Sequence, residues 1–568
     1  MTRRALIVAL AGLCVASACA RRGGEFDLVI YGGRIVDGTG NPWYYGDVGI
    51  KGSRIAVIAA PGTLREAPAR ERIDATGLVV APGFIDVQSH SWNQLLFADG
   101  RVIGKISQGV TSEILGEATT PAPSNAKLDS LYLGGDSDDS LMLERVRRFR
   151  GPRGFGAWLD SMQAHGNAVN VGSFLGATTV RAYAMGQKEG EAGPAELDTM
   201  RAIVANAMRD GAFGLSSALI YPPGSYAGTQ ELIELAKAMA PYHGTYITHI
   251  RSEESGLLGA LDEAVRIGRE AGVPVVIYHL KASGRANWPL AGPAIAKIDS
   301  ARAAGQDVKA TMYPYPASGN NLSSCIPDWV HADGKLLERL RDLSLRSRIR
   351  SEMTATNPGA PIYCQHNPPD AYLISGFKRP EYLGFQGKRL DEIARALGKD
   401  WAEAIIQLTL DEENRLSKIT FAMSEANVAR MIARPWVVIG SDAGGFDPET
   451  TTALVHPRAY GTFPRVLGKY VRQDSVLTLE DAVRKMTWST AQILWLRDRG
   501  LVKEGMFADI AIFDPSTVMD RATFDRPHQL SVGVKYTLVN GVVVWRDGRY
   551  TGAKPGVALR GPGWNGGR

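Results

Sequence analysis

The chain has 568 residues, of which 45% are hydrophobic, and its formal net charge at pH 7 is +5. This length accommodates one large domain with a smaller one beside it, and the composition is that of a globular protein. The small charge and the lack of a basic stripe interleaved with aromatic residues argue against a nucleic-acid partner.

The first twenty residues have the features of a targeting segment. Two arginines precede an apolar run, residues 5–18, which is too short to span a membrane comfortably. Cleavage is expected either before Cys19 with lipidation of that cysteine, as in bacterial lipoproteins, or after Ala20, as in ordinary secretion. Residues 1–20 are therefore predicted to be a signal peptide. The mature protein is expected in the periplasm, or on a bacterial membrane through a lipid on Cys19 alone, because no other segment is apolar enough to cross a bilayer.

Both ends of the mature chain are rich in short apolar strands and Gly-containing turns. Residues 26–80 show this pattern first, and residues 496–555 repeat it, with Asn540-Gly541 as a hairpin turn. Together the two ends are predicted to form a small β-sandwich. Residues 556–568 are expected to be a tail.

The middle of the chain, residues 81–495, alternates apolar strands with helical stretches. Strands are predicted at residues 84–90, 110–117, 168–176, 212–218, 245–251, 274–280, 307–313 and 436–442. Between two of them, LLGALDEAVRIGREAG has apolar residues at helical spacing and ends at Gly272, a helix stop signal. Eight strands with intervening helices predict an α/β fold, a TIM-like (β/α)₈ barrel. The interval 314–435 is too long for one crossover and is expected to contain an inserted lid.

Only two cysteines, Cys325 and Cys364, lie inside the predicted domains. Two isolated cysteines form neither a disulfide framework nor a CxxC zinc site. The sequence is compatible with one disulfide between them or with two free buried thiols, and we predict the free thiols.

Polar residues stand where several predicted strands end, which is where barrels of this type carry their active sites. They are Gln88, His90, Glu117, His249, Arg251, His279, Lys281 and Asp442. Catalytic zinc takes three protein ligands from such residue types and leaves one position for water, whose pKa it lowers to about 7. A neighbouring carboxylate can then carry the proton from the attacking water to the leaving nitrogen. The pattern therefore predicts a metal-dependent hydrolase.

Several longer segments follow one another in a recognisable order. They are APGFIDVQSH, GLSSALIYPPGSYA, THIRSE, PVVIYHLKASG, GSDAG, HPRAYGTFPRVLG and RGLVKEGMFADIAIFDP. Over residues 26–560 this order resembles the amidohydrolase superfamily, and within it the N-acyl-D-amino-acid deacylases, or D-aminoacylases. The resemblance implies a metal-bearing (β/α)₈ barrel with a β-sandwich built from both chain ends. It also implies hydrolysis of an N-acyl-D-amino acid to a carboxylate and a D-amino acid.

The resemblance assigns roles position by position. His249 and His279 match the zinc ligands of the fifth and sixth strands, and Asp442 matches the general base and acid. His90 matches the second histidine of a His-x-His pair, whose first position holds Gln88 here. The cysteine ligand of D-aminoacylases is missing. Glu117 lies one residue before its expected position, and we expect this carboxylate to replace it.

Glu117, His249 and His279 provide enough ligands for one tightly bound zinc ion. Gln88 is a neutral amide and a poor zinc ligand compared with imidazole. A second metal position, formed by His90 with Gln88 beside it, is therefore expected to be weak or empty.

The substrate is expected to be a small N-acyl amino acid or a peptide-like molecule that carries a carboxylate. Arginine and lysine suit the capture of that group. The candidate substrate-binding residues are Lys281, Arg251, Tyr221, Arg458 and His456. The lid within 314–435 is expected to contact the acyl group.

Two other interpretations stay open. The first is a dipeptidase or cyclic-amide hydrolase of the same superfamily, although such relatives typically use a carboxylated lysine that the fourth strand lacks. The second is a catalytically dead binding protein, against which the presence of Asp442, His249 and His279 argues. Acyl preference, chirality and oligomeric state do not follow from these residues.

Overall fold

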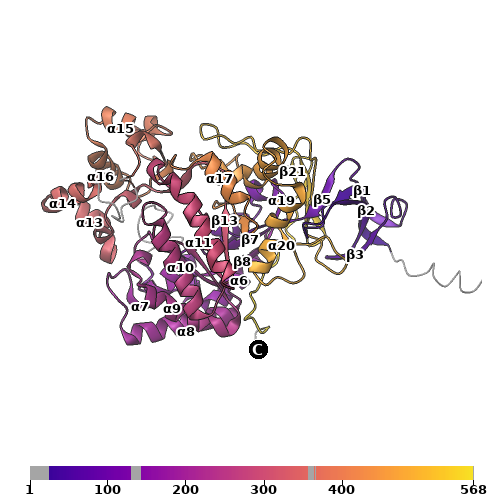
Figure 1. Ribbon diagram of the computed structural model, residues 1–568, viewed down its shortest axis with the longest axis horizontal. Coiled ribbons are helices and arrows are strands. Elements are labelled where there is room, and N and C mark those ends of the chain that lie inside the picture. The colour runs from indigo at the N-terminus through magenta and orange to yellow at the C-terminus, as the bar shows by residue number, and fades with distance from the viewer. Residues whose placement is uncertain (1–24, 130–142, 356–363, 365, 567–568) are drawn as a thin grey trace, which may run out of the picture.

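The computed structural model describes residues 25–129, 143–355, 364 and 366–566. The predicted signal peptide, residues 1–20, lies outside the described residues. In Figure 1, three parts follow one another along the long axis of the molecule. A β-rich part made mainly of the chain ends lies at one side, the barrel in the centre, and the helices of an insertion at the other side.

All eight predicted barrel strands are present, and most are shorter than expected. They are β6 (Phe84–Asp86), β7 (Val110–Leu115), β8 (Asn170–Ser173) continued by β9 (Leu175–Gly176), β10 (Gly214–Ala218), β11 (Thr245–His249), β12 (Val275–Ile277), β13 (Val308–Met312) and β17 (Val437–Ile439). Each is parallel to its neighbours. The ring passes from one sheet to the other where β8 runs into β9, and a parallel bridge between Ser89 and Ala443 joins its two ends. The predicted TIM-type barrel is confirmed.

Side-chain alternation along the strands divides the hydrophobic core of the barrel into two clusters. In β12, Val275 and Ile277 belong to the cluster shared with the surrounding helices, whereas Val276 belongs to a second cluster with residues of the other strands. This is the period of two expected of a strand that is buried on both faces. The second cluster therefore fills the inside of the barrel.

The helices around the barrel include α6 (Gly154–His165), α8 (Pro194–Asp210), α9 (Thr229–Met239), α10 (Leu257–Ala271), α11 (Ala291–Ala303), α17 (Glu425–Ile432) and α19 (Leu479–Met486). Helix α10 is the one predicted from its apolar spacing. It ends at Gly272, which adopts φ +70, a conformation that glycine accepts without steric cost. None of the helices in the described ranges has the length and apolar character needed to cross a bilayer.

The two ends of the chain share one nine-stranded sheet. Its strands are β1 (Phe26–Ile35), β2 (Tyr44–Lys51), β3 (Arg54–Ala59), β4 (Ala69–Asp74), β5 (Val79–Pro82), β18 (Ile510–Phe513), β19 (Val534–Val539), β20 (Val542–Arg546) and β21 (Arg549–Tyr550). The ends meet where β5 pairs with β18 in antiparallel orientation. The union of both ends in one sheet agrees with the sequence pattern, and a separate β-sandwich domain stays a prediction.

The C-terminal segment, predicted as a tail, packs against the barrel. Leu559 is only 5% exposed and packs in the cluster inside the barrel, beside Ile493 of helix α20 (Trp488–Ile493). Its backbone N–H donates to the carbonyl of Val171 in β8 at 2.7 Å. The end of the chain thus covers part of the barrel floor.

The insertion predicted within 314–435 is a compact unit with its own core. It contains the sheet β14 (Ser318–Asn321), β16 (Ser417–Thr420) and β15 (Tyr372–Ser375), and the helices α12 (Asp328–His331), α13 (Leu336–Arg341), α14 (Leu343–Thr354), α15 (Leu390–Ala396) and α16 (Trp401–Asp411). Cys325 and Cys364 form a disulfide within this core. The prediction of two free thiols is therefore wrong, because folding brings together two cysteines that are 39 residues apart.

Candidate metal centre and substrate cavity

A cavity of about 400 Å³ lies at the carboxyl ends of the barrel strands. Six of the predicted strand-end residues line it: His90, Glu117, His249, His279, Lys281 and Asp442. Strand β14 of the insertion forms part of its wall. The strand-end rule thus located a set of side chains that converge in space although they are far apart in the sequence.

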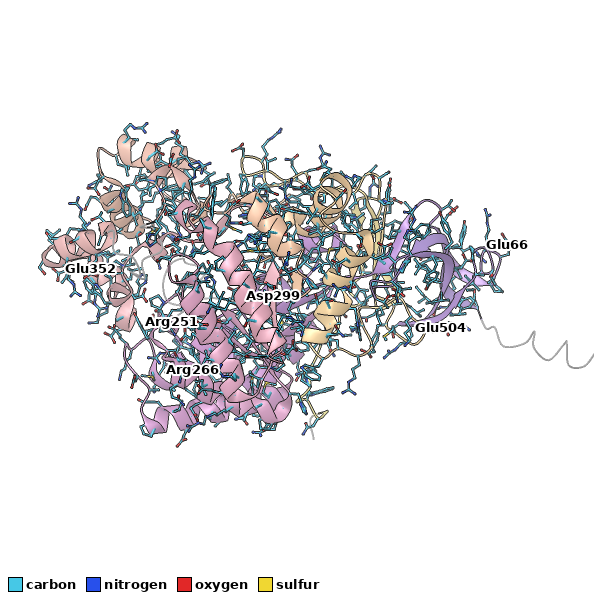
Figure 2. The ribbon with its side chains drawn as sticks, viewed as in Figure 1. Glu66, Arg251, Arg266, Asp299, Glu352 and Glu504 are labelled. Carbon is cyan, nitrogen blue, oxygen red and sulfur yellow. A yellow bond between two sulfur atoms is a disulfide. The ribbon has the colours of Figure 1, made fainter. Side chains whose placement is uncertain are left out.

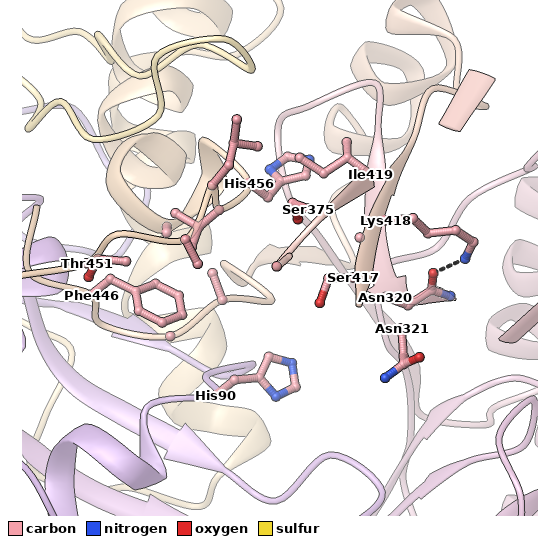
Figure 3. A pocket seen from close by; sticks show the side chains of 18 of the residues that line it. His90, Asn320, Asn321, Ser375, Ser417, Lys418, Ile419, Phe446, Thr451 and His456 are labelled. Atoms are coloured by element: carbon pink, nitrogen blue, oxygen red, sulfur yellow. Dashed lines mark hydrogen bonds between the residues drawn. The ribbon is translucent and has the colours of Figure 1, made fainter. Parts of the chain in front are cut away.

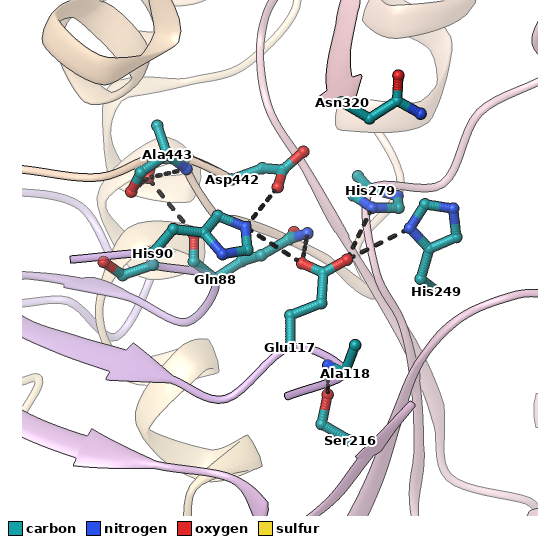
Figure 4. Close-up of polar contacts among 12 residues, drawn as sticks. Gln88, His90, Glu117, Ala118, Ser216, His249, His279, Asn320, Asp442 and Ala443 are labelled. Atoms are coloured by element: carbon teal, nitrogen blue, oxygen red, sulfur yellow. Dashed lines mark hydrogen bonds and ion pairs between the residues drawn. The ribbon is translucent and has the colours of Figure 1, made fainter. Parts of the chain in front are cut away.

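Glu117 stands between the two histidines predicted as zinc ligands. Its Oε1 lies 3.3 Å from Nδ1 of His249 and 3.3 Å from Nε2 of His279 (Figure 4). These ligand atoms all lie within 4.8 Å of one another. One carboxylate and two imidazoles, with room for water from the cavity, make the donor set of a catalytic zinc site. The residues present therefore fit a zinc ion.

The electrostatics of Glu117 favour a bound cation. Burial alone would raise the pKa of this carboxyl, but hydrogen bonds with His249, His279 and His90 outweigh burial and hold the pKa well below its usual range. The side chain is therefore ionised at neutral pH and available to a metal ion.

A second group of potential ligands shares Glu117. Its Oε2 lies 3.5 Å from Nε2 of His90, and the same nitrogen lies 2.9 Å from Oδ1 of Asp442. The ligand atoms of His90, Glu117 and Asp442 also lie within 4.8 Å of one another. Glu117 thus belongs to both groups of potential ligands.

Gln88 contacts Glu117 directly. Its Nε2 donates to Oε2 of Glu117 at 2.7 Å, and its Oε1 accepts from Oγ1 of Thr311 at 2.8 Å. Both polar atoms of the amide are engaged. Gln88 therefore orients Glu117.

His279 and Asp442 both have a positive φ, of 31° and 52°. Such a conformation is uncommon for residues other than glycine and costs roughly 1–3 kcal/mol, and residues that keep it are concentrated at functional sites. The backbone N–H of His279 donates to Oγ1 of Thr311 at 2.7 Å, and that of Asp442 donates to the carbonyl of Gln88 at 2.8 Å. These bonds hold both side chains toward the cavity in spite of the local strain.

The charge of Asp442 is set by its neighbours. Burial would raise the pKa of this carboxyl, but the positive charge of Arg458 and the hydrogen bond with His90 lower it below its usual value. Nη1 of Arg458 lies 2.6 Å from Oδ2 of Asp442. Asp442 is therefore an ionised base beside the metal centre.

One residue of the site, Glu253, was not predicted from the sequence. Its Oε1 lies 3.0 Å from Nδ1 of His279 and 3.5 Å from Nε2 of His249, the two ring nitrogens that face away from Glu117. A carboxylate in this position fixes the tautomer and the ring orientation of histidines that bind a metal. Its position four residues after His249, in the loop that follows β11, was the signal available in the sequence.

Replacing Glu253 with glutamine is expected to weaken zinc binding about 10- to 100-fold, because His279 loses the carboxylate that orients its ring. Competition with a chelator of known affinity measures this change. Glu270→Gln on α10, where the carboxylate pairs with Arg266 at the surface, is the matched control and is expected to bind zinc as the wild type does. Equal affinities in the two variants would contradict the role assigned to Glu253.

One of the predicted substrate-binding residues does not contact the cavity as expected. Arg251 is labelled in Figure 2. Its guanidinium makes two bonds of 2.9 Å with Glu263 and donates to backbone carbonyls of Ser225 and Ala227. Strand β11 ends at His249, so the alternation that placed Arg251 on the same face does not continue. The prediction for Arg251 is wrong.

His456 lines an adjoining chamber, but both of its ring nitrogens are engaged with the backbone. Nε2 lies 3.0 Å from the carbonyl of Ala317, and Nδ1 accepts the N–H of Arg458 at 3.1 Å. Both nitrogens support the backbone beside Arg458, and contact of His456 with the substrate stays a prediction.

The other three predicted residues, Lys281, Tyr221 and Arg458, line the cavity. The Lys281 ammonium contacts the Glu253 carboxylate and lies 2.8 Å from Nδ1 of His279, so it also belongs to the surroundings of the metal ligands. The Tyr221 ring lies 5.4 Å from that of His249, measured between centroids.

The adjoining chamber has a volume of about 690 Å³ and shares His90, Asp442, Arg458 and residues 319–321 of β14 with the first cavity. Figure 3 shows it between the insertion and the segment that follows Asp442. One wall is apolar and includes Phe446, Leu454 and Val455, and the opposite wall includes polar residues of β16 and its flanking loops. Together the two cavities can enclose a substrate with a polar and an apolar end.

Comparison with known proteins identifies the family. The model of the Amidohydrolase family matches residues 384–545. The chain is 36% identical over 544 residues to the D-aminoacylase of Alcaligenes xylosoxydans xylosoxydans, covering 94% of this chain and 97% of that protein. The chain belongs to the amidohydrolase family. It is a metal-dependent amide hydrolase that resembles D-aminoacylases.

The solved structures of two deacylases are also similar to that of this amidohydrolase. A D-aminoacylase with a binuclear metal centre, for which one-metal activation and second-metal attenuation are described, matches with a TM-score of 0.76 and 36% identity over 94% of this chain and 100% of that chain. The N-acyl-D-glutamate deacylase of Bordetella bronchiseptica, in complex with zinc and a phosphonate inhibitor, matches with a TM-score of 0.77 and 32% identity over the same shares.

Proposed function

We propose that this amidohydrolase is a zinc-dependent N-acyl-D-amino-acid deacylase, which releases a carboxylate and a D-amino acid. The observation that carries the proposal is the convergence of Glu117, His249 and His279 beside the ionised Asp442 in one cavity. The likeness to curated deacylases of D-amino acids, N-acyl-D-glutamate and N-acyl-D-aspartate supports the substrate class.

When bound, zinc would polarise the amide carbonyl and lower the pKa of water. The Asp442 carboxylate accepts a proton from the attacking water and returns it to the amide nitrogen as the C–N bond breaks. One C–O bond forms for each C–N bond broken, so the products are a carboxylic acid and an amine. Arg458 keeps Asp442 ionised before the reaction.

His90 is protonated at neutral pH in the arrangement described. Burial would lower its pKa, but hydrogen bonds with Asp442 and Glu117 outweigh burial and raise the pKa to about 10. Its Nε2 donates to Asp442 and holds that carboxylate in place.

Arg458, Lys281 and Tyr221 are the residues that we assign to the carboxylate of the substrate. All three line the cavity that contains Asp442 and the metal ligands, and each provides a donor suited to an anionic oxygen. The acyl group then extends into the adjoining chamber beside Phe446, Leu454 and Val455.

We infer one tightly bound zinc ion and a weak or empty second position. Gln88→His is expected to raise the metal content toward two ions per chain, because an imidazole replaces an amide beside His90 and Glu117. Elemental analysis of purified protein measures this ratio. Gln108→His, at a buried glutamine bonded to backbone groups away from the cavity, is the control for an added histidine. Two zinc ions held tightly by the wild type would contradict the inference.

A hydrolysis screen tests the function. Purified protein with added zinc is offered N-acetyl-D-amino acids, N-acetyl-L-amino acids, dipeptides and hydantoins, and release of free amine is measured. Selective turnover of the D-series is expected. Turnover of dipeptides or hydantoins alone would overturn the proposed substrate class while leaving the amidohydrolase chemistry intact.

We also infer that the protein is exported, as the apolar segment before Ala20 suggests. The disulfide between Cys325 and Cys364 supports an oxidising compartment such as the periplasm, since disulfides are rare in the cytosol. Mass spectrometry of the mature N-terminus distinguishes lipidation of Cys19 from cleavage after Ala20, and an intact N-terminus would contradict both.

A further inference from the structure

Two residues of the insertion form a hydrogen-bonded chain that ends at Tyr221. Asn320 of β14 and Lys418 of β16 are directly opposite in the antiparallel register. The Lys418 ammonium donates to Oδ1 of Asn320 (Figure 3) and, at 2.8 Å, to Oγ of Ser324. Nδ2 of Asn320 lies 3.0 Å from the hydroxyl of Tyr221. These hydrogen bonds thus connect the insertion to the wall of the metal cavity.

The chemistry of Lys418 fixes which group donates and which accepts in each of these hydrogen bonds. A charged lysine has donors and no acceptor, so it binds the oxygen of the Asn320 amide and never its nitrogen. The amide nitrogen must then face Tyr221 and donate to the tyrosine oxygen. The single hydrogen of the Tyr221 hydroxyl is left to be donated elsewhere.

The Tyr221 hydroxyl is left to donate this hydrogen into the cavity. Tyr221 lines the cavity beside the metal ligands, and its hydroxyl has no acceptor among the residues that the structure describes other than Asn320, whose nitrogen is a donor here. Burial raises the pKa of the Tyr221 hydroxyl, so the group keeps its proton. A neutral, oriented hydroxyl is a donor suited to an anionic oxygen.

Lys418 is well placed to keep this direction constant. It is 1% exposed, and Asn320 is its cross-strand neighbour, so neither side chain is free to leave the pair. Burial lowers the pKa of Lys418 to about 7, so the charged form that fixes this direction is the majority form below pH 7, which is where the variants are to be compared.

We propose that Lys418 and Asn320 are positioning residues of the insertion, which fix the direction of the hydrogen bonds so that Tyr221 donates to the carboxylate of the substrate. The inference rests on the proposed function for the identity of that carboxylate. It explains why the insertion contributes β14 to the cavity: the insertion sets which way a barrel residue donates.

Asn320→Asp reverses the direction of the hydrogen bond between residue 320 and Tyr221, because a carboxylate accepts from both Lys418 and Tyr221. The tyrosine hydroxyl then donates to the introduced carboxylate instead of the substrate. We expect KM for an N-acetyl-D-amino acid to rise about 10- to 100-fold with kcat little changed, which is the loss of one hydrogen bond to a charged group from ground state and transition state alike. Tyr221→Phe is expected to give the same rise.

The double variant separates positioning from a merely structural effect. If Asn320 acts through Tyr221, Asn320→Asp combined with Tyr221→Phe loses no more than Tyr221→Phe alone. Lys418→Met is expected to raise KM and Lys418→Arg, also a pure donor, to restore it. Lys399→Met, at a lysine of the insertion outside both cavities, is the matched control for loss of a lysine, and thermal unfolding checks that each variant is folded.

Additive losses in the double variant, or an Asn320→Asp enzyme with the KM of the wild type, would overturn the inference. Failure of the proposed function gives a different result, namely a wild type that does not hydrolyse N-acyl amino acids. Calorimetric titration with N-acetyl-D-amino acids then decides: weaker binding by Asn320→Asp than by wild type supports the inference without turnover, and equal or absent binding rejects it.

Discussion

Asp442→Asn is expected to lower kcat by roughly 10²- to 10⁴-fold, the usual contribution of a general acid–base group. Asparagine keeps the size of the side chain and an oxygen for His90, but it cannot take a proton from water or return one to the leaving nitrogen. Because Asp442 is not one of the three residues around the tight metal position, the zinc content is expected to stay unchanged. Steady-state kinetics and elemental analysis of the same preparation measure both.

The control for this variant is Asp262→Asn. Asp262 lies on α10, exposed, with Lys297 as its partner at 2.5 Å, and its replacement is expected to leave kcat and zinc content as they are. An Asp442→Asn protein that keeps its kcat would assign proton transfer to another group. An inactive variant that has also lost zinc would show that Asp442 holds the metal.

The barrel could be predicted because its signals are local. Each strand is a short apolar run, and helices such as α10 carry both their spacing and their stop residue in the sequence. The strand-end rule then placed Glu117, His249 and Asp442 in one cavity without knowledge of any distance. The rule holds here both for His249, the last residue of β11, and for Glu117 and Asp442, which follow the ends of β7 and β17.

The same rule fails for Arg251 and does not find Glu253. Arg251 follows the end of β11, so the loop conformation and not strand alternation decides where it points, and its guanidinium binds Glu263. Glu253 lies in that same loop, and the loop turns it back to His279. Both outcomes depend on backbone turns that no periodicity describes.

Long-range pairings were also beyond the sequence. The disulfide between Cys325 and Cys364, and the register that places Asn320 opposite Lys418, both depend on how the insertion folds around its own core. The sequence shows the types of these residues but not that they meet. This is why the insertion was predicted only as a lid, while its contribution to the direction of hydrogen bonds at Tyr221 required the structure.

Glu117→Gln is expected to remove the tightly bound zinc and, with it, the hydrolytic activity. The carboxylate supplies the only negative charge among the three ligand groups, and its loss replaces an anionic ligand oxygen with a neutral amide. We expect zinc affinity to fall on the order of 10²-fold or more, since a catalytic site has three protein ligands and even residues behind them change affinity 10- to 100-fold.

Gln88 makes this variant more informative than a simple deletion. Its Nε2 donates to Oε2 of Glu117, so the introduced glutamine can keep that bond by presenting its own oxygen, and the amide nitrogen then faces His249 and His279. An amide N–H cannot bind a cation, whereas Glu117→Asp keeps the charge and is expected to keep part of the affinity. Elemental analysis and chelator competition on both variants measure the difference. Full zinc content in Glu117→Gln would mean that the two histidines hold the metal with another partner, and that Glu117 serves only to orient them.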